Sequence, residues 1–330
     1  MRTRPPHLLP HRSVPRAATV LGLAAAVVVL AGACAPTPPP TTEPSTPPTT
    51  STPPDVGEPT DRLPNDWGAE LFEPDLVDLA YDPEGPYPER LADLYLPVAG
   101  GNRGVIVHVH GGGFVEGARS DVERYTGPLL RQLERGFSIL TIDYRFEAFP
   151  AAVLDLDAAV RFVRSAPAVE LGVVADTVLV SGHSAGATVA ADLALAADRG
   201  DAEPFGRLSE VDGWLSVSAL TDLHTSYRGE PPAATGWAAL DEPAASPLVH
   251  LDPEDPPGLV IHGVDDGIVY VEHAWALQDR ALELDVTQVL FDLVDDGPEE
   301  CRHHLPMCGA SIAGIDAFVD GVAGVSAPQV

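Results

Sequence analysis

A serine stands at the centre of the pattern Gly-x-Ser-x-Gly in residues 182–186. The residues before it, 177–181, are mostly apolar and β-branched and predict a buried strand, and residues 187–197 are rich in Ala and Leu and predict a helix. A serine at the apex of a sharp strand-to-helix turn can attack a carbonyl carbon, and its flanking glycines permit the strained backbone. The context therefore predicts that Ser184 is a nucleophile rather than part of an ordinary glycine turn.

A glycine-rich turn follows a second predicted buried strand. The strand covers residues 104–109, and the run His-Gly-Gly-Gly follows at 110–113. A turn with few side chains can aim backbone N–H groups at a reacting group, and acyl transfer needs such donors for its negatively charged tetrahedral intermediate. We assign this oxyanion hole to the N–H groups of Gly112, Gly113 and Ala185, the residue after the nucleophile.

Composition excludes several classes of function. The chain has 330 residues, 45% of them apolar, with 19 Arg, no Lys and 49 acidic residues, for a formal charge of −30. Such a surface repels nucleic acid and anionic headgroups, so no nucleic-acid partner is expected, and a lysine Schiff base is excluded. His108 and His110 form a His-x-His pair, but no further ligand cluster lies near them in the sequence. We therefore expect no metal and no cofactor.

Predicted strands and helices alternate along the chain. Edge strands are expected at 77–81 and 90–96; helices at 120–135, 151–165 and 311–322; and further strands at 138–143, 214–220, 259–263 and 287–291. This alternation is the pattern of a parallel sheet with crossover helices. Arg145 and Asp155 are predicted to form a buried structural pair, Asp222 to cap a loop, and His273 to lie on the surface of a helix.

The motifs and their order resemble the α/β-hydrolases, in particular the esterase group of hormone-sensitive-lipase-like enzymes and related bacterial carboxylesterases. The resemblance spans about Leu91 to Val319 and rests on the segments DLYLP (93–97), HGGGF (110–114), DYR (143–145), FPAA (149–152), GHSAG (182–186), SP (246–247), HG (262–263) and DD (265–266). One departure is FEA at 146–148, where many relatives carry LAPE. The resemblance implies an α/β-hydrolase fold, with a mostly parallel sheet and crossover helices on both faces, for residues 61–330.

The resemblance also implies an acid and a base, in the chain order Ser, Asp, His. A serine hydroxyl needs a base, and the base needs a third group to orient it. The family's acid lies a few residues after a His-Gly pair and just before a short apolar stretch; residues 267–269 supply that stretch, which favours Asp266 over Asp265. The base lies between the last strand and the last helix, where His303 and His304 are adjacent. Both cannot point at Ser184; the sequence leaves the choice open, with a slight preference for His303.

The first 60 residues are predicted to direct export. Residues 1–33 begin with arginines and end in an apolar run too short to span a bilayer comfortably, which predicts a signal peptide. The run LAGAC at 30–34 resembles a bacterial lipobox, which would make Cys34 the lipid-modified first residue; the alternative is a plain secretory signal. Residues 34–60 are rich in Pro, Thr and Ser and predict an extended tether. We expect a lipid-anchored cell-surface protein, or otherwise a secreted one.

The other two cysteines, Cys301 and Cys308, bracket the paired histidines. Export leads to an oxidising compartment, so a Cys301–Cys308 disulfide is expected.

The motifs and the resemblance together imply a serine carboxylesterase that hydrolyses short- to medium-chain carboxylic esters through an acyl-enzyme, with a small-molecule ester as its partner. The alternatives are an amide-directed hydrolase of the formamidase or peptidase type, and a non-catalytic binding protein on a hydrolase scaffold.

Overall fold

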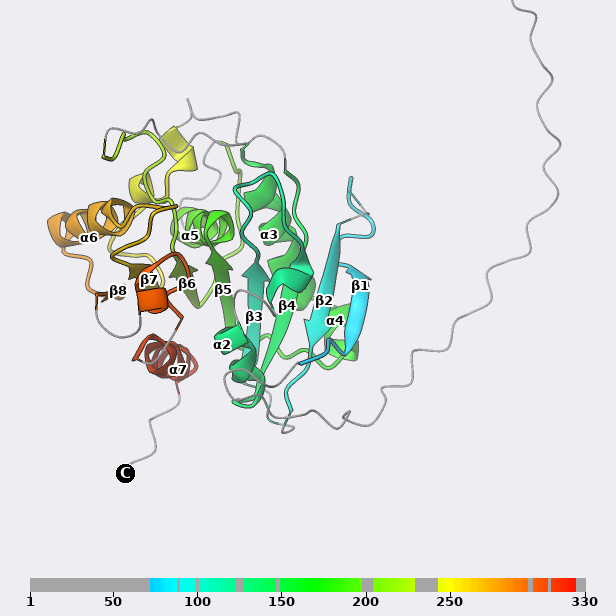
Figure 1. Ribbon diagram of the computed structural model, residues 1–330. Coiled ribbons are helices and arrows are strands. Elements are labelled where there is room, and N and C mark those ends of the chain that lie inside the picture. Colours follow the sequence, from blue (N-terminus) through cyan, green and yellow to red (C-terminus); the bar gives the residue numbers. More distant parts are fainter. Residues whose placement is uncertain are drawn as a thin grey trace, which may run out of the picture. The chain divides into compact units, whose positions relative to one another are not determined.

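An eight-stranded sheet forms the centre of the molecule, with strand order β1-β2-β4-β3-β5-β6-β7-β8 (Figure 1). The strands are β1 Leu76–Ala80, β2 Leu91–Tyr95, β3 Gly104–Val109, β4 Phe137–Ile142, β5 Val178–His183, β6 Gly213–Val217, β7 Gly258–Gly263 and β8 Val289–Val294. Strand β2 pairs antiparallel with β1 and with β4, and every other neighbouring pair is parallel. The predicted, mostly parallel sheet is confirmed.

The computed structural model describes residues 72–87, 90–98, 101, 103–122, 127–146, 149–197, 204–228, 243–295, 299–307 and 310–324. These residues all fall within the compact unit Gly57–Val330. The predicted signal peptide, Cys34 and the predicted tether lie outside the described residues.

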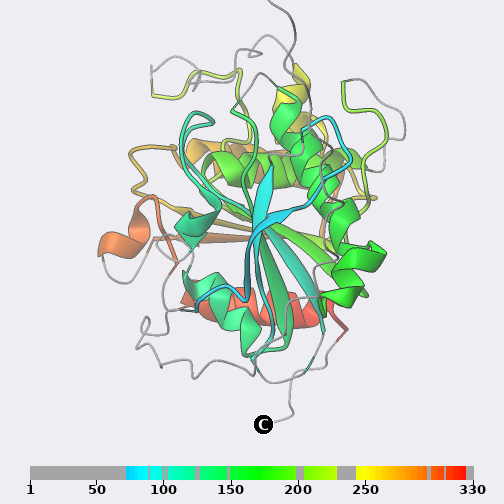
Figure 2. The ribbon, with the colours of Figure 1, turned by 90° about the vertical axis from the view of Figure 1, so that its right-hand side faces the viewer.

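Helices cover both faces of the sheet. They are α2 Gly127–Leu130, α3 Ala151–Val163, α4 Ala166–Glu170, α5 Ala185–Ala196, α6 Glu272–Leu284 and α7 Ala310–Val322, with short 3-10 helices η1 Arg119–Asp121, η2 Arg131–Leu133, η4 Pro243–Ala245, η5 Pro247–Val249 and η6 Glu299–Arg302. Figure 2 shows α7, in red, on one side of the sheet and α5, in green, on the other. Within the described part of the chain, no helix is both long and apolar enough to cross a membrane.

Each central strand supplies apolar side chains to both layers. In β3, Val105, Val107 and Val109 belong to the core that includes residues of α3, α5 and α6, whereas Ile106 belongs to the core that includes residues of α2 and α7. Side chains of a strand alternate between its faces, so a strand buried on both faces is apolar throughout. The predicted helices on both faces of the sheet are confirmed.

Three sequence predictions about elements are wrong. A single helix over 120–135 does not form: the described part of this stretch holds η1, α2 and η2, and Pro128 lacks the N–H that a continuous helix requires. Strand β6 ends at Val217 rather than Leu220, because Ser218 has a φ of 55° that turns the chain. His273 is buried rather than on the surface, and its Nδ1 atom accepts a hydrogen bond from the Asp222 N–H at 3.3 Å.

The predicted structural pair is confirmed and has a third member. The Nη2 atom of Arg145 lies 2.7 Å from Oδ1 of Asp155, which has no exposed surface. Arg90 also pairs with Asp155, and it joins β2 to α3 through this carboxylate. Asp222 caps its loop as predicted, since its Oδ1 atom accepts hydrogen bonds from the N–H groups of His224 and Thr225.

Asp192 is an unusual member of α5, a helix whose residues are all buried. Its side chain has no exposed surface, and neither carboxylate oxygen has a hydrogen-bond partner among the described residues. Burial raises the pKa of Asp192 well above its ordinary value, because the charged form would lose its hydration. The carboxyl group is therefore held in its neutral form inside the core.

We predict that Asp192→Asn stabilises the protein more at pH 8 than at pH 4.5. Above about pH 4 an aspartate ionises in the unfolded chain but stays protonated in the folded one, so the free energy of unfolding falls as pH rises towards the folded pKa. An asparagine amide does not titrate in this range, so its contribution to the free energy of unfolding does not fall as pH rises. Thermal melts should show a difference in Tm that grows with pH, at about 2–4 °C per kcal/mol. The exposed Asp279→Asn is the control; a difference in Tm that is equal at both pH values would contradict the prediction.

Candidate active site

Ser184 occupies a sharp turn between β5 and α5. Its φ of 54° and ψ of −122° are strained for a residue with a side chain. Its N–H donates to the carbonyl of Val217 on the neighbouring strand at 2.8 Å. A Cβ atom on Gly186 would lie 2.2 Å from the carbonyl oxygen of Val109, so the first turn of α5 fits against the end of β3 only with glycine there. The predicted strand, turn and helix around Ser184 are all present.

The glycine-rich turn after β3 lies directly against this serine. A Cβ atom on Gly111 would be 3.2 Å from Cβ of Ser184. The carbonyl of Gly112 accepts hydrogen bonds from Val115 and Glu116, whereas among the described residues the N–H groups of Gly112 and Gly113 donate none. The N–H of Ala185 is the first of α5 and has no acceptor within the helix. The three predicted oxyanion donors thus belong to two segments that meet at Ser184.

Asp266 and His304 are brought into contact by the loops that follow β7 and β8. The Nδ1 atom of His304 lies 2.7 Å from Oδ2 of Asp266, whose side chain has no exposed surface. The other oxygen, Oδ1, accepts hydrogen bonds from the N–H groups of Ile268 at 2.8 Å and Val269 at 3.0 Å. The carboxylate is therefore held in place from both sides.

The surroundings of Asp266 stabilise its charged form. Burial alone would raise its pKa, but hydrogen bonds from His262, His304 and the Ile268 N–H hold the pKa of Asp266 below its ordinary value. The side chain consequently remains a carboxylate at neutral pH, as an acceptor for an imidazole N–H must.

His303 points to a different partner. Its Nδ1 atom lies 3.0 Å from the carbonyl oxygen of Asp265 and does not contact the Asp266 carboxylate. Asp265 also contacts the neighbouring Arg302. Its carboxylate forms an ion pair of 2.5 Å with the Arg302 guanidinium group, and its N–H donates to the Arg302 carbonyl at 2.8 Å. These contacts fix the register of the two loops, so it is the ring of His304 that reaches Asp266. The geometry therefore does not support the sequence preference for His303.

The ring of His183 contacts the segment that carries His304. The Nε2 atom of His183, the residue before the serine, lies 3.0 Å from the carbonyl oxygen of His304, and the centres of the two rings are 4.8 Å apart. Burial, together with the neighbouring His304, lowers the pKa of His183 to about 4, so the ring is neutral and donates from Nε2. This contact brings His304 beside the turn that carries Ser184.

The role of His262 was missed by sequence reasoning. Its Nε2 atom lies 2.8 Å from the carbonyl oxygen of Val269 and 3.5 Å from Oδ2 of Asp266. The ring thus supports both the acid and the backbone turn after it. The available signal was its place in the His-Gly pair that directly precedes the acidic residues.

The His-x-His pair of β3 has structural partners. His108 is buried with its Nδ1 atom 2.8 Å from the hydroxyl of Ser181, and burial lowers the pKa of His108 to about 3. The ring of His110 packs 4.6 Å from that of Tyr144. Among the described residues, no group of three or more His, Cys, Asp or Glu side chains could hold a metal ion.

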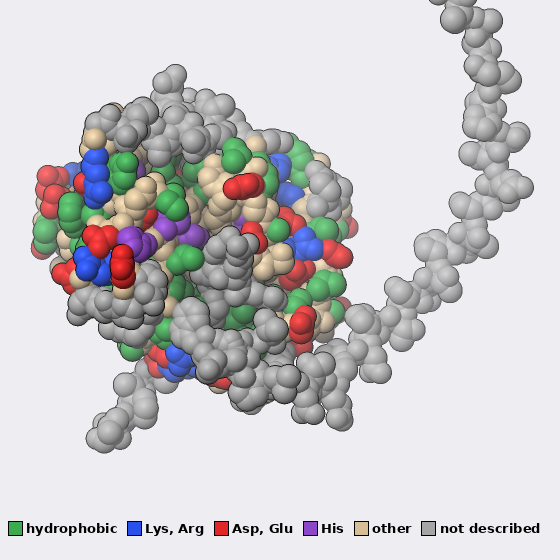
Figure 3. Space-filling view, in the orientation of Figure 1, with side chains coloured by type: hydrophobic (Ala, Val, Ile, Leu, Met, Phe, Trp, Pro, Cys, Tyr) green, Lys and Arg blue, Asp and Glu red, His purple; other side chains and the backbone are tan. Residues whose placement is uncertain are grey.

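The predicted site residues share one edge of the sheet. The glycine-rich turn, Ser184, Asp266 and His304 come after β3, β5, β7 and β8, whose carboxyl ends meet at one edge because these strands are parallel. Figure 3 shows histidine side chains gathered on the surface of the molecule in this view. This edge thus holds a serine hydroxyl, an imidazole–carboxylate pair and backbone N–H groups that have no acceptor among the described residues.

Cys301 is buried. Cys308 lies outside the described residues, so the Cys301–Cys308 pairing itself stays a prediction.

Comparisons with known proteins show that the chain is similar to esterases. The sequence model of the BD-FAE family matches residues 92–281, more than half of the chain. Two esterases of Mycobacterium tuberculosis, LipC and LipQ, are each 29% identical to this chain over 206 and 213 residues; these cover 56% and 58% of the chain and 50% and 49% of the relatives. The chain thus spans about half the length of the curated relatives it matches.

The fold is also found in solved structures. A truncated carbohydrate esterase from gut microbiota superposes with a TM-score of 0.64 at 19% identity, over 76% of this chain and 96% of that one. Together with the family match, this confirms the resemblance to α/β-hydrolases that was inferred from the motifs.

Proposed function

The chain belongs to the BD-FAE family, and from this premise we propose that it is a serine carboxylesterase. The observation that carries the proposal is the contact between His304 and the buried Asp266 beside the strained turn of Ser184. A buried carboxylate, an imidazole and a serine on a sharp turn form the constellation that acyl transfer requires. The named esterases LipC and LipQ support the choice of an ester as the substrate.

In the proposed reaction, the Ser184 hydroxyl attacks the carbonyl carbon of the ester while His304 accepts its proton. Asp266 holds the imidazole through Nδ1, which leaves Nε2 to face the hydroxyl, and stabilises the imidazolium that forms. The N–H groups of Gly112, Gly113 and Ala185 bind the oxyanion. His304 then protonates the leaving alcohol, and water, activated by the same imidazole, cleaves the acyl-enzyme.

The substrate range that we propose is short- to medium-chain carboxylic esters. This proposal comes from the resemblance of the motifs to bacterial carboxylesterases rather than from the shape of the site.

We further propose that the protein is exported and anchored through a lipid on Cys34. The support is the sequence alone: a basic start, a short apolar run and small residues before Cys34. Residues 34–60 would then separate the enzyme from the membrane.

We predict that the protein hydrolyses p-nitrophenyl acetate and butyrate faster than the palmitate. Ser184→Ala should lower kcat by about 10⁴-fold or more, because no other group can form the acyl-enzyme. The measurement is initial rates across the chain-length series, with the exposed Ser120→Ala as a control that keeps wild-type rates. Labelling by a fluorophosphonate without ester turnover would point to an amide-directed hydrolase, and no labelling would point to a non-catalytic protein.

The two adjacent histidines should differ sharply in kinetics. His304→Ala should lower kcat by about 10⁴-fold, because of these two adjacent rings it is the His304 ring that contacts Asp266. His303→Ala should keep kcat within about threefold, as an exposed side chain outside the reaction does. Equal losses in both variants, measured with p-nitrophenyl butyrate at equal Tm, would contradict the assignment of the base.

We predict a disulfide between Cys301 and Cys308, which would close a short loop around His304. Mass spectrometry of a non-reduced digest should find the two peptides linked. Free thiols at both positions in the exported protein would contradict the prediction.

A further inference from the structure

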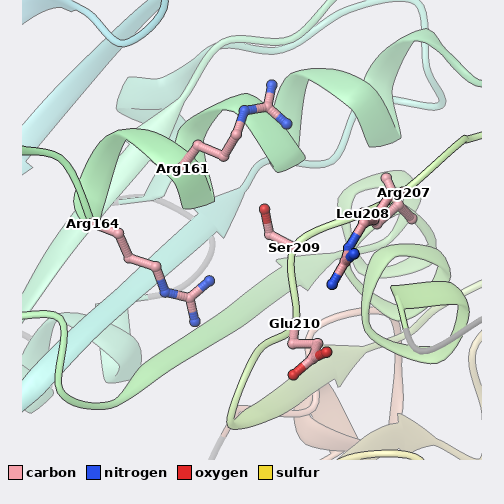
Figure 4. Close-up of a pocket in the computed structure, with 6 residues that line it drawn as sticks. All are labelled: Arg161, Arg164, Arg207, Leu208, Ser209 and Glu210. Carbon is pink, nitrogen blue, oxygen red and sulfur yellow. The ribbon is translucent and has the colours of Figure 1, made fainter. Parts of the chain in front are cut away.

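A cavity of about 550 Å³ opens on the surface beside the end of α3. Its lining is Arg161, Arg164, Arg207, Leu208, Ser209 and Glu210. Figure 4 shows the guanidinium groups of Arg164 and Arg207 on either side of the Ser209 hydroxyl, and the Glu210 carboxylate directed away from that hydroxyl. Three cations and one anion thus share the cavity, in a chain with a formal charge of −30.

This cavity is separate from the candidate active site. Helix α3 begins after the carboxyl end of β4 and runs back along the sheet, so its final turn lies near the amino ends of the strands. The loop of Arg207 leads into the start of β6, and Asp212, which ends this loop, bonds to Val178 at the start of β5. The cavity is therefore at the edge of the sheet opposite Ser184.

Two of its arginines lack the partners that the other described arginines have. Every other arginine in the described part of the chain forms an ion pair with a carboxylate. Within the described part of the chain, no ion pair involves Arg164 or Arg207. Carboxylates outnumber arginines by 49 to 19 in the whole sequence, so pairing is the ordinary outcome here. Two unpaired guanidinium groups in one cavity therefore indicate a place for an external anion.

The cavity is built on fixed backbone. The Oδ1 atom of Asp157, a buried residue of α3, accepts the N–H of Ser209 at 2.7 Å, and its other oxygen pairs with Arg161. Leu208, between Arg207 and Ser209 in the sequence, is buried and anchors the loop that carries these two residues. Asp157 thus neutralises Arg161 from within the protein and leaves Arg164 and Arg207 as the free cations of the site.

We propose that this cavity binds a small organic anion through a phosphate or carboxylate group. The planar guanidinium fork matches both groups, and the two arginines flank a serine hydroxyl that can donate a further hydrogen bond. A volume of about 550 Å³ admits a ligand of sugar size. The site is open to solvent, so binding weakens as salt is added.

The test is calorimetric titration of the full chain at low ionic strength with inorganic phosphate and, separately, with glucuronate. The double variant Arg164→Gln/Arg207→Gln removes the free cations. The double variant Arg131→Gln/Arg280→Gln makes the same change in net charge at exposed positions elsewhere. Because the readout is binding, the result does not depend on esterase activity.

The wild-type protein and the charge-matched control should bind at least one of the two anions, and the cavity variant should bind it at least about tenfold more weakly. The better-bound anion identifies the ligand group. A third variant, Arg164→Lys/Arg207→Lys, keeps the charge and should retain phosphate better than glucuronate, whose two oxygens need the fork. No binding by the wild type, or equal weakening in the cavity and control variants, would overturn the proposal.

Discussion

Backbone segments at the carboxyl edge of the sheet lie closer together than any side chain would permit, and the candidate site depends on this contact. A Cβ atom on Gly186 would lie 2.2 Å from the Val109 carbonyl, and one on Gly263 would lie 2.2 Å from the carbonyl of His303. The first contact places the helix after Ser184 on the end of β3. The second places the loop that carries His303 and His304 on the end of β7. Main-chain packing thus brings together the segments that carry Ser184, His304 and Asp266.

Two imidazole rings, those of His262 and His304, lie beside the Asp266 carboxylate at this edge. A buried charge is costly unless it is paired and hydrogen-bonded, and Asp266 meets this condition through two backbone N–H groups and the ring of His304. Burial lowers the pKa of His183 to about 4, so it adds no competing positive charge near His304. The His304 ring lies opposite this fixed negative partner, which is the arrangement on which its proposed role as general base rests.

The sequence predicted best those features that a local backbone conformation encodes. The turn at Ser184 and the glycine run at 110–113 were each predicted to follow a buried apolar strand. The structure has these strands, β5 and β3, directly before them. Which of His303 and His304 contacts Asp266 could not be predicted in this way, because it depends on contacts of Arg302 with Asp265, far away in the sequence. His273 was misplaced for a different reason: it lies on the buried face of its helix with Leu277 and Ala281, at the four-residue spacing of a helix, and this spacing was not used to place it.

Arginine has one recurrent use in this chain, which contains no lysine. It joins segments distant in sequence through carboxylates, as when Arg90 connects β2 to α3 and Arg103 pairs with Asp320 of α7. Such ties are abundant because acidic residues are abundant, and each one consumes the hydrogen-bonding capacity of a guanidinium group. An arginine that escapes pairing in these surroundings keeps its donors for a ligand. The cavity of Arg164 and Arg207 is a local exception to this pairing, which is why we propose a small anion as its ligand.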